Sequence, residues 1–253
     1  MKHALITGTS SGIGLALTNQ LLAMGYQVHG IGRQAPALAH QAGYSHHLCD
    51  LSDIGNLTTE MMRFLGPREN VRCFNFVALN AGQFCQAMRR VSDTPMEEIA
   101  YLLELNCLAN KTVLDALFRS GIEVPLCAVS TSIAGQRARA GNGGYAISKA
   151  ALNMMMELYA LEHPQTFFAV IGLCAVNTFL GNQVGTLSLP DDPAFAEQSR
   201  LRARLPGTGY VVTPEERAGH LLSLLLPAHD PRVQSGKFVE IRDLVNAKPV
   251  NSI

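Results

Sequence analysis

Short apolar runs alternate along this chain with longer segments in which apolar residues recur at the spacing of an α-helix. Apolar runs of this length, bounded by turn-forming residues, predict buried strands. The predicted strands span residues 3–7, 27–31, 46–49, 73–79, 125–130, 167–173 and 238–241. The predicted helices span residues 12–24, 54–65, 95–106, 109–120, 144–163 and 214–225.

This alternation is typical of βα units that feed a parallel sheet covered by helices on both faces. With 253 residues, of which 47% are hydrophobic, the chain can bury one large core, and no linker or internal repeat divides it. We therefore expect a single-domain α/β fold over residues 1–253. It would be a Rossmann-like doubly wound parallel β-sheet flanked by helices on both faces.

One stretch, residues 180–209, breaks the alternation, because glycines and prolines surround a single short helical segment at 194–205. Long insertions in compact domains are often lids or binding loops. We expect a substrate-binding lid at about 179–209. Apolar side chains in and beside it predict either an apolar or aromatic ligand or packing of the lid onto the body: Phe195, Leu201, Leu205 and Tyr210.

Charge and cysteine usage narrow the possible partners and location. Lys and Arg total 20, as do Asp and Glu, so no overall field draws the chain to nucleic acid or to an anionic membrane. The six cysteines are widely spaced and predict buried thiols in a reducing compartment. The amino-terminal apolar run is too short for a signal peptide or an anchor. We expect a cytoplasmic location, without nucleic acid or membrane as a partner.

A glycine-rich turn, T-G-T-S-S-G-I-G over residues 7–14, lies between the first predicted strand and the first predicted helix. Gly8 can adopt backbone angles closed to other residues, Gly12 leaves room for a pyrophosphate, and Gly14 lets the helix pack close to the sheet. Phosphates would bind the free N–H groups at the helix N-terminus. The spacing is not G-x-G-x-x-G and also suits a plain strand-to-helix turn. Its position in the chain favours dinucleotide binding.

The second predicted strand leads into Gly32 and Arg33, where dinucleotide folds place the residue that contacts the adenosine ribose. An Asp or Glu there would select NAD, whereas an Arg accommodates the 2′-phosphate of NADP. These residues favour NADP(H) over NAD(H), although Arg33 also suits a solvated surface. Asp50 can accept a hydrogen bond from the adenine amino group or cap the following helix, a role for which Ser52 and Asp53 are alternatives.

Tyr145 and Lys149 lie four residues apart in the predicted helix 144–163, so their side chains share one face. A free tyrosine, with a pKa of about 10, is a poor acid-base catalyst at neutral pH. A neighbouring ammonium and an oxidised nicotinamide favour the phenolate, so we expect the pair to bring the pKa of the phenol into a useful range. The spacing by itself also occurs by chance on many helices.

Ser132 follows the fifth predicted strand, at the carboxyl end where open α/β sheets bind ligands. Its hydroxyl can donate to a substrate oxygen and hold that oxygen beside Tyr145. Ser130 and Thr131 compete for this role. Each of the three hydroxyls can instead satisfy loop backbone.

Two adjacent histidines, His46 and His47, lie close to Cys49. Adjacent residues of a strand point to opposite faces of a sheet, so joint ligation of one ion is improbable and no metal site is expected. No G-x-S-x-G segment precedes a helix, which argues against a serine hydrolase.

Taken together, these residues resemble the short-chain dehydrogenases/reductases over nearly the whole chain. The matching segments, in order, are T-G-x-x-x-G-I-G at 7–14, Asp50, N-A-G at 80–82, Asn106, Ser132 and Y-x-x-x-K at 145–149. The resemblance implies an oxidoreductase that transfers a hydride between a nicotinamide and a carbonyl or alcohol substrate, with Tyr145 as general acid or base. The alternative is a catalytically silent NADP(H)-binding regulatory protein of the same fold, although both Tyr145 and Lys149 are present.

The resemblance also implies roles for single residues. Lys149 would bind the nicotinamide ribose, Ser132 would orient the carbonyl, and Tyr145 would deliver the proton. The backbone of Asn106 would hold a water that links Lys149 to solvent; without the resemblance, Asn106 ends the predicted helix 95–106. The candidate catalytic residues are Tyr145, Lys149, Ser132 and Asn106. The candidate cofactor contacts are Gly8, Ser10, Ser11, Gly12, Ile13, Gly14, Arg33, Asp50, Leu51, Asn80, Ala81, Gly82, Tyr145, Lys149, Val176 and Thr178.

Two departures from the family pattern lie at the cofactor site. Leu173 and Cys174 stand where family members usually carry Pro-Gly. The backbone leading to Thr178, which the resemblance implies is the contact of the nicotinamide carboxamide, can therefore run differently. Leu79 stands before Asn80 where the family often has Asn, a change that we expect to matter little.

Family members are commonly dimers or tetramers, so the resemblance implies a homodimer or homotetramer that shares the helices at 109–120 and 144–163. The methionine run at 154–156 suits such a face, or the core of one chain. The other expected partner is a small-molecule carbonyl or alcohol substrate. Arg137 and Arg139 can meet an acidic group of that substrate or simply face solvent.

Overall fold

The computed structural model describes residues 1–205 and 210–245, and in them seven strands form one sheet. In chain order the strands are β1 (His3–Thr7), β2 (Gln27–Gly32), β3 (Tyr44–Leu48), β4 (Phe76–Leu79), β5 (Leu126–Thr131), β6 (Phe167–Gly172) and β7 (Phe238–Glu240). Their order across the sheet is β3-β2-β1-β4-β5-β6-β7, and every neighbouring pair is parallel. The predicted single α/β domain with a doubly wound parallel sheet is confirmed.

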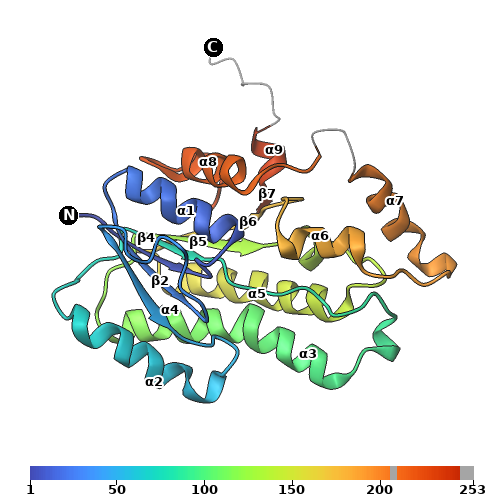
Figure 1. The fold of residues 1–253 in the computed structure, drawn as a ribbon, viewed down its shortest axis with the longest axis horizontal. Helices are drawn as coiled ribbons and strands as arrows, with labels where there is room; N and C mark the ends of the chain where they lie inside the picture. The colour runs from blue at the N-terminus through green and yellow to red at the C-terminus, as the bar shows by residue number, and fades with distance from the viewer. Residues whose placement is uncertain (206–209, 246–253) are drawn as a thin grey trace, which may run out of the picture.

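Helices cover both faces of the sheet, as Figure 1 shows. One face carries α1 (Gly12–Ala23), α8 (Pro214–Leu225) and α9 (Ile241–Val245). The other carries α2 (Ile54–Leu65), α4 (Ala109–Arg119) and α5 (Gly143–Glu162), and α3 (Met96–Leu103) packs against α5. Because successive side chains of a strand point to opposite faces, Leu5 of β1 packs in one apolar core, and Ala4 and Ile6 pack in the other.

The strand order reverses at β1, which has β2 on one side and β4 on the other. Open α/β sheets bind ligands in the crevice outside the carboxyl ends of their strands at such a point. Two further helices, α6 (Phe179–Thr186) and α7 (Ala196–Arg204), extend beyond this end of the sheet (Figure 1). The fold therefore places the candidate site between the sheet and the segment predicted to be a lid.

The sequence predicts that one helix ends at residue 106 and another begins at residue 109, and this predicted interruption is wrong. Helix α3, a π-helical turn over Glu104–Leu108 and helix α4 follow one another without interruption. A π turn widens the helix locally, so the apolar faces before and after it differ in phase. That change of phase in the apolar pattern looks like the end of one helix and the start of the next.

The segment at 180–209 holds more regular structure than its composition predicts. Gly181 and Gly185 disfavour a helix, yet α6 forms, because Thr178 Oγ1 accepts from the Gly181 N–H at 3.0 Å and caps its first turn. Residues 206–209 of the predicted lid lie outside the described residues. Strand β4 is shorter than the predicted 73–79, since Cys73 makes only a single bridge, with Glu123.

All six cysteines lie in the described residues, and all are unpaired. Four of them are buried among the apolar cores: Cys49, Cys85, Cys107 and Cys127. Across residues 1–205 and 210–245, none of the helices has both the length and the apolar character needed to cross a membrane.

Gly14 in α1 marks a close approach of a helix to the sheet. A Cβ at this position would lie 2.0 Å from the Gly8 carbonyl oxygen and 2.8 Å from Asn80 Nδ2. Because backbone cannot move aside as a flexible side chain can, we expect Gly14→Ala to lower the free energy of unfolding by roughly 2–3 kcal/mol. Urea denaturation measures this loss.

Gly55→Ala, in the first turn of α2, is the matched control. A Cβ there would meet only Asp53 Oδ1, at 3.7 Å, which is an ordinary contact. We expect its free energy of unfolding to change by less than about 0.5 kcal/mol. Equal losses in the two variants would contradict the importance of the close approach at Gly14.

Candidate active site

The glycine-rich turn lies at the carboxyl ends of β1 and β2. Gly8 has a φ of +77° and Gly12 a φ of +57°, values that favour glycine. Ser10 and Ser11 are exposed, and the Ser11 hydroxyl makes no capping bond to α1. The N–H groups at the start of α1, from Gly12 and Ile13 onward, are therefore left without a side-chain cap, which is an arrangement suited to phosphate.

The segment Asn80–Gly82 after β4 supports this turn. The N–H groups of Asn80 and Ala81 donate to Thr7 Oγ1 at 2.9 and 3.1 Å. Asn80 Nδ2 donates to the carbonyl oxygens of Thr7 and Gly8 at 3.4 and 3.5 Å. Thr7 was not singled out from the sequence, yet it joins β1 to β4. Its position directly before Gly8 was the available signal.

At the end of β2, Gly32 faces the turn, since a Cβ there would lie 3.9 Å from Gly8 Cα. Arg33 follows and is exposed. The predicted nucleotide-reading position is therefore open to solvent beside the glycine-rich turn. Any side chain at position 32 would lie against that turn.

Asp50 is held by its own loop. Asp50 Oδ1 accepts from the Ser52 N–H and hydroxyl at 2.9 and 2.7 Å. Partial burial acts to raise the pKa of Asp50, but these hydrogen bonds and the charge of Arg33 hold that pKa below its usual value. The cap of α2 is Asp53, which resolves the alternative left by the sequence. Leu51 is buried beneath the loop.

Tyr145 lies in the first turn of α5, and Ser132 follows β5. A 3-10 turn over Ile133–Gly135 packs directly on α5, where a Cβ on Gly135 would lie 2.7 Å from the carbonyl carbon of Lys149. The Ser132 hydroxyl accepts from the Ala134 N–H of this turn at 3.1 Å, and it lies near enough to Tyr145 to act on the pKa of the phenol. Gly135 was missed by sequence reasoning, and its need arises only from this helix contact.

The three candidate hydroxyls after β5 have different partners. Ser132 Oγ accepts from the Ala134 N–H at 3.1 Å, and it is the one of the three that acts on the pKa of Tyr145. Ser130 Oγ donates to Asn80 Oδ1 at 3.2 Å, and Thr131 Oγ1 donates to Asn153 Oδ1 at 2.5 Å. Ser132, rather than its two competitors, is therefore the hydroxyl beside the tyrosine.

Lys149 is buried, with 5% of its surface exposed. Its ammonium donates to the Ser130 carbonyl oxygen at 2.9 Å and lies 5.7 Å from the centre of the Tyr145 ring. Gly82 lies beside this group and leaves room for the Asn106 carboxamide, because a Cβ there would lie 2.9 Å from Asn106 Oδ1. The predicted Tyr-Lys pair is thus on one face of α5 and turned toward the strand ends.

Burial controls the proton affinities of this pair. Burial raises the pKa of the Tyr145 phenol to about 12, although the hydrogen bond with Ser132 acts to lower it. Burial lowers the pKa of Lys149 to about 8, an effect that Cys107 partly opposes. The expected lowering of the pKa of the phenol by Lys149 is therefore absent from this structure, since loss of solvation outweighs the neighbouring ammonium.

Asn106 is fully buried in the π-helical turn and does not end a helix as its place in the predicted 95–106 segment implied. Its side chain accepts from the Gln83 N–H and donates to the Gln83 carbonyl oxygen, both at 2.9 Å, and donates to Ser148 Oγ at 3.0 Å. Its backbone carbonyl accepts from Asn110 Nδ2 at 2.8 Å. Asn106 thus fixes the loop after β4 to α5. A water at its backbone stays a prediction.

Although Leu173 and Cys174 stand in place of Pro-Gly after β6, the backbone still brings Thr178 to the glycine-rich turn. Cys174 adopts a φ of +61°, a left-handed conformation that glycine adopts without strain. Its thiol donates to Glu240 Oε1 at 3.0 Å. Val176 is buried, and Thr178 comes next to the glycine-rich turn, where a Cβ on Gly12 would lie 3.1 Å from Thr178 Cγ2.

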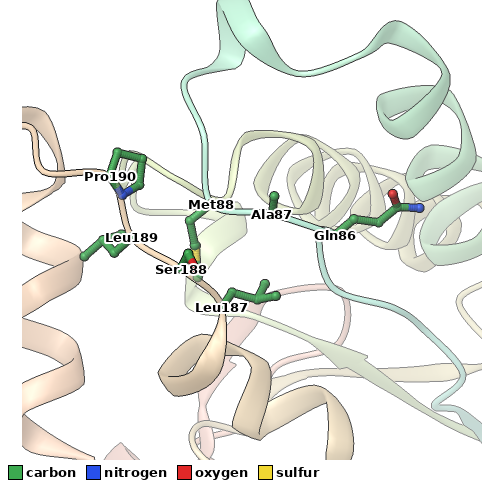
Figure 2. A pocket seen from close by; sticks show the side chains of 7 residues that line it. All are labelled: Gln86, Ala87, Met88, Leu187, Ser188, Leu189 and Pro190. Atoms are coloured by element: carbon green, nitrogen blue, oxygen red, sulfur yellow. The ribbon is translucent and has the colours of Figure 1, made fainter.

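The Tyr145 ring is buried in an apolar cluster. Phe84 packs against it with a distance of 4.8 Å between ring centres. The cluster extends to Met88 and to two residues after α6, Leu187 and Leu189. A cavity of about 370 Å³ opens between the segments 86–88 and 187–190, as Figure 2 shows.

Several residues of the 179–210 region pack on the body of the protein. Phe195 is 1% exposed, and a Cβ on Gly141 would lie 3.2 Å from its ring. The Arg242 guanidinium lies 4.0 Å from the centre of the Tyr210 ring. Phe195 and Tyr210 therefore pack onto the body of the protein, which is one of the two alternatives left by the sequence.

Arg137 and Arg139 both contact Glu197, with N–O distances of 3.5 and 3.8 Å. A third pair, between Arg90 and Asp192, also connects this segment to the loop after β4. These arginines therefore meet acidic groups of the same chain. An acidic substrate group is not needed to explain them.

The two adjacent histidines point to opposite faces of the sheet, as predicted. His46 Nδ1 lies 2.8 Å from the Tyr44 hydroxyl, and His47 Nε2 lies 3.1 Å from Glu60 Oε2 on α2. Among the residues that the structure describes, no group of three or more His, Cys, Asp or Glu side chains gathers as a metal site would require.

The candidate cofactor residues fit a dinucleotide. The uncapped N–H groups of α1 suit its phosphates, and Gly12 keeps the approach to them free of a side chain. Arg33 follows β2 on one side of the glycine-rich turn. Lys149 lies with Tyr145 at the end of β5, on the other side. The catalytic and cofactor roles themselves stay predictions.

Comparisons with known proteins agree with this geometry. The short chain dehydrogenase family model matches residues 2–185. A benzil reductase ((S)-benzoin forming) from Bacillus subtilis is 24% identical over 97% of this chain and 100% of its own length. Among solved structures, a Francisella tularensis short chain dehydrogenase family protein superposes with a TM-score of 0.76, 23% identity and coverage of 95% of this chain and 97% of its own.

A further solved structure is an alcohol dehydrogenase from the archaeon Thermococcus sibiricus, complexed with 5-hydroxy-NADP. It superposes with a TM-score of 0.70 and 27% identity, covering 95% of each chain. The family match covers well over half of the chain, and the fold agrees along nearly all of it. The chain therefore belongs to the short-chain dehydrogenase/reductase family and is an oxidoreductase of the carbonyl/alcohol class.

Proposed function

We propose that this protein is an NADP(H)-dependent carbonyl reductase in which Tyr145 is the general acid. The observation that carries the proposal is the buried Tyr145 phenol, which lies beside Ser132 and Lys149 and packs in an apolar cluster that extends to a cavity. A proton donor and a second hydroxyl thus converge where a carbonyl oxygen can bind.

The bound cofactor supplies the hydride, and the chain supplies orientation and the proton. Ser132 donates to the carbonyl oxygen and holds it beside the phenol. Tyr145 donates its proton to that oxygen as negative charge develops there, which is where a fixed donor contributes most. Lys149 would hold the ribose next to the reacting ring, and its charge would stabilise the phenolate that remains.

The proton affinities favour reduction as the working direction. With a pKa raised to about 12 by burial, the phenol carries its proton at neutral pH and is ready to donate it. Oxidation of an alcohol needs the phenolate, which this environment disfavours. The buried Lys149 and the charge of an oxidised nicotinamide would have to offset that cost.

NADP(H) is the proposed cofactor because Gly32 and Arg33 occupy the ribose-reading position. Neither position holds an acidic residue that would repel a 2′-phosphate, and the exposed guanidinium can pair with it. The 5-hydroxy-NADP in the Thermococcus sibiricus relative supports this choice.

The substrate is proposed to be an apolar or aromatic ketone or diketone. Phe84, Met88, Leu187 and Leu189 offer apolar surface near the phenol. The benzil reductases among the relatives support the same class. The segment at about 179–209 would act as the lid over this substrate.

A homodimer or homotetramer in the cytoplasm completes the proposal. Helix α5 carries an exposed apolar stripe that suits a shared helical face: Ile147, Met154, Leu158 and Leu161. Met155 and Met156 of the methionine run pack in the core of the chain instead. The six unpaired cysteines are consistent with a reducing compartment.

Replacement of Tyr145 by Phe tests the proposed acid. We expect Tyr145→Phe to lower kcat for reduction of an aromatic diketone by about 10²–10⁴-fold, because the ring is kept and the proton donor is lost. The Kd for NADPH, measured by fluorescence titration, should stay within about twofold. Tight NADPH binding by the unaltered chain without turnover of any ketone, diketone or quinone would instead support the regulatory alternative.

The pKa of Lys149 predicts a pH dependence. Below about pH 8 the ammonium is charged, and it loses that charge as the pH rises through about 8, whereas Tyr145 stays protonated to about pH 12. We expect kcat/KM for NADPH to be level below about pH 8 and to fall above it, since this parameter reports the free enzyme. In Lys149→Arg the guanidinium stays charged, so the fall near pH 8 should disappear. An unchanged profile in that variant would contradict the assignment.

Arg33 should carry the preference for NADP(H). We expect Arg33→Ala to weaken NADPH binding about tenfold, the loss of one charge-assisted contact at an exposed site, and to leave NADH binding almost unchanged. Arg119→Ala, an exposed arginine on α4, is the matched control and should alter neither. Equal loss of both cofactors in Arg33→Ala would contradict a 2′-phosphate contact.

A further inference from the structure

A polar network lies under the adenosine end of the proposed cofactor site. On one face of β2 two residues are glycines, Gly30 and Gly32, and on the same face of β3 two residues are polar, Tyr44 and His46. A Cβ on Gly30 would lie 2.1 Å from the Tyr44 hydroxyl oxygen and 2.7 Å from Thr9 Oγ1. The glycines therefore leave the space that the β3 side chains occupy.

The network connects the glycine-rich turn to the end of β2. Thr9 Oγ1 lies 2.8 Å from the Tyr44 hydroxyl, and that hydroxyl lies 2.8 Å from His46 Nδ1. His46 Nε2 lies 3.1 Å from the Gly32 carbonyl oxygen. Thr9 is fully buried and Tyr44 is 9% exposed, so water does not compete freely for these bonds.

The direction of each hydrogen bond follows from chemistry. The Gly32 carbonyl can only accept, so His46 Nε2 must carry a proton. Burial holds the pKa of His46 below its usual value, so the ring is neutral and Nδ1 accepts from the Tyr44 hydroxyl. Tyr44 has then used its proton, and the Thr9 hydroxyl can donate to the Tyr44 oxygen or to His46 Nδ1, which lies 3.4 Å away. Thr9, Tyr44 and His46 thus form one connected network.

The network ends where the nucleotide would bind. Gly32 stands at the ribose-reading position, and a Cβ there would lie 3.9 Å both from Gly8 Cα and from His46 Cε1. The His46 ring thus borders the same space as the glycine-rich turn. It also fixes the carbonyl of the residue directly before Arg33.

We propose that Tyr44 and His46 are positioning residues for the adenosine end of the NADP(H) site, holding Thr9 of the glycine-rich turn in register with Gly32. This inference rests on the proposed function. It assigns to His46 a role through the backbone of Gly32, distinct from metal binding and from direct contact with the reacting atoms. Loss of the network should loosen cofactor binding and leave the chemistry at Tyr145 intact.

The test is NADPH affinity in Tyr44→Phe, measured by fluorescence titration together with kcat at saturating NADPH. Removing one buried hydroxyl should raise the Kd about fivefold, matching one net hydrogen bond, while kcat stays within about twofold. Tyr159→Phe is the matched control, because the Tyr159 hydroxyl is also buried and bonded, to Asp115 in the layer on the other face of the sheet. Tyr159→Phe should lower the midpoint of thermal unfolding about as much as Tyr44→Phe does, and it should leave the Kd for NADPH unchanged.

Two substitutions of His46 separate its bonds. The amide nitrogen of Gln can take the place of Nε2 and keep the bond to Gly32, whereas Asn reaches only as far as Nδ1 and loses it. Gln offers no atom at the Nδ1 position to accept from Tyr44, and Asn offers none at the Nε2 position for Gly32. Each substitution breaks one of the two bonds of His46, so we expect each to weaken NADPH binding about fivefold. The double variant Tyr44→Phe, His46→Asn should lose less than the product of the single effects, since either change already breaks the connection.

The outcomes distinguish this inference from the proposed function. If the unaltered chain binds NADPH and Tyr44→Phe binds it within about twofold as well, the positioning role is overturned and the proposed function stands. The same holds if Tyr159→Phe loses as much affinity as Tyr44→Phe, because the effect then follows stability alone. Failure of the unaltered chain to bind either NADPH or NADH would overturn both.

Discussion

The close contact between α1 and the glycine-rich turn at Gly14 is the constraint on which the cofactor side of this protein depends. A helix N-terminus can offer its N–H groups to a ligand only if it comes near the strand ends, and here that approach leaves no room for a Cβ beside the Gly8 carbonyl. Asn80 adds a second restraint, because its side chain bonds the same turn from β4. Two segments distant in sequence, the turn with α1 and the segment after β4, are thereby held around one crevice.

Burial plays the corresponding part on the catalytic side. Lys149 and Asn106 are polar side chains removed from water, and each is compensated by named partners, Ser130 and Gln83 among them. The same burial moves the pKa of Tyr145 up and the pKa of Lys149 down. Burial disfavours the charged form of both groups, so a charge brought by a ligand would have a large effect on their pKa values.

At both ends of the crevice, glycines leave space for groups of neighbouring elements. At the catalytic end, Gly82 makes space for the Asn106 carboxamide, and Gly135 lets the turn that carries Ser132 lie against the backbone of α5. At the adenosine end, Gly30 makes space for the hydroxyls of Tyr44 and Thr9. Absent side chains on strands and turns thus determine where polar side chains from neighbouring elements meet.

The sequence by itself determined the α/β class, the glycine-rich turn and the shared helical face of Tyr145 and Lys149, because these follow from local periodicity and short spacings. The resemblance of its motifs to a known family indicated the family. Only the tertiary structure decided which of the three hydroxyls after β5 reaches Tyr145, that Asn106 lies in a π turn, and that Phe195 packs on the body. It also decided the direction of the pKa shift of Tyr145 and the partners of His46. Each of these depends on burial and on distances between residues far apart in the chain, which no local pattern records.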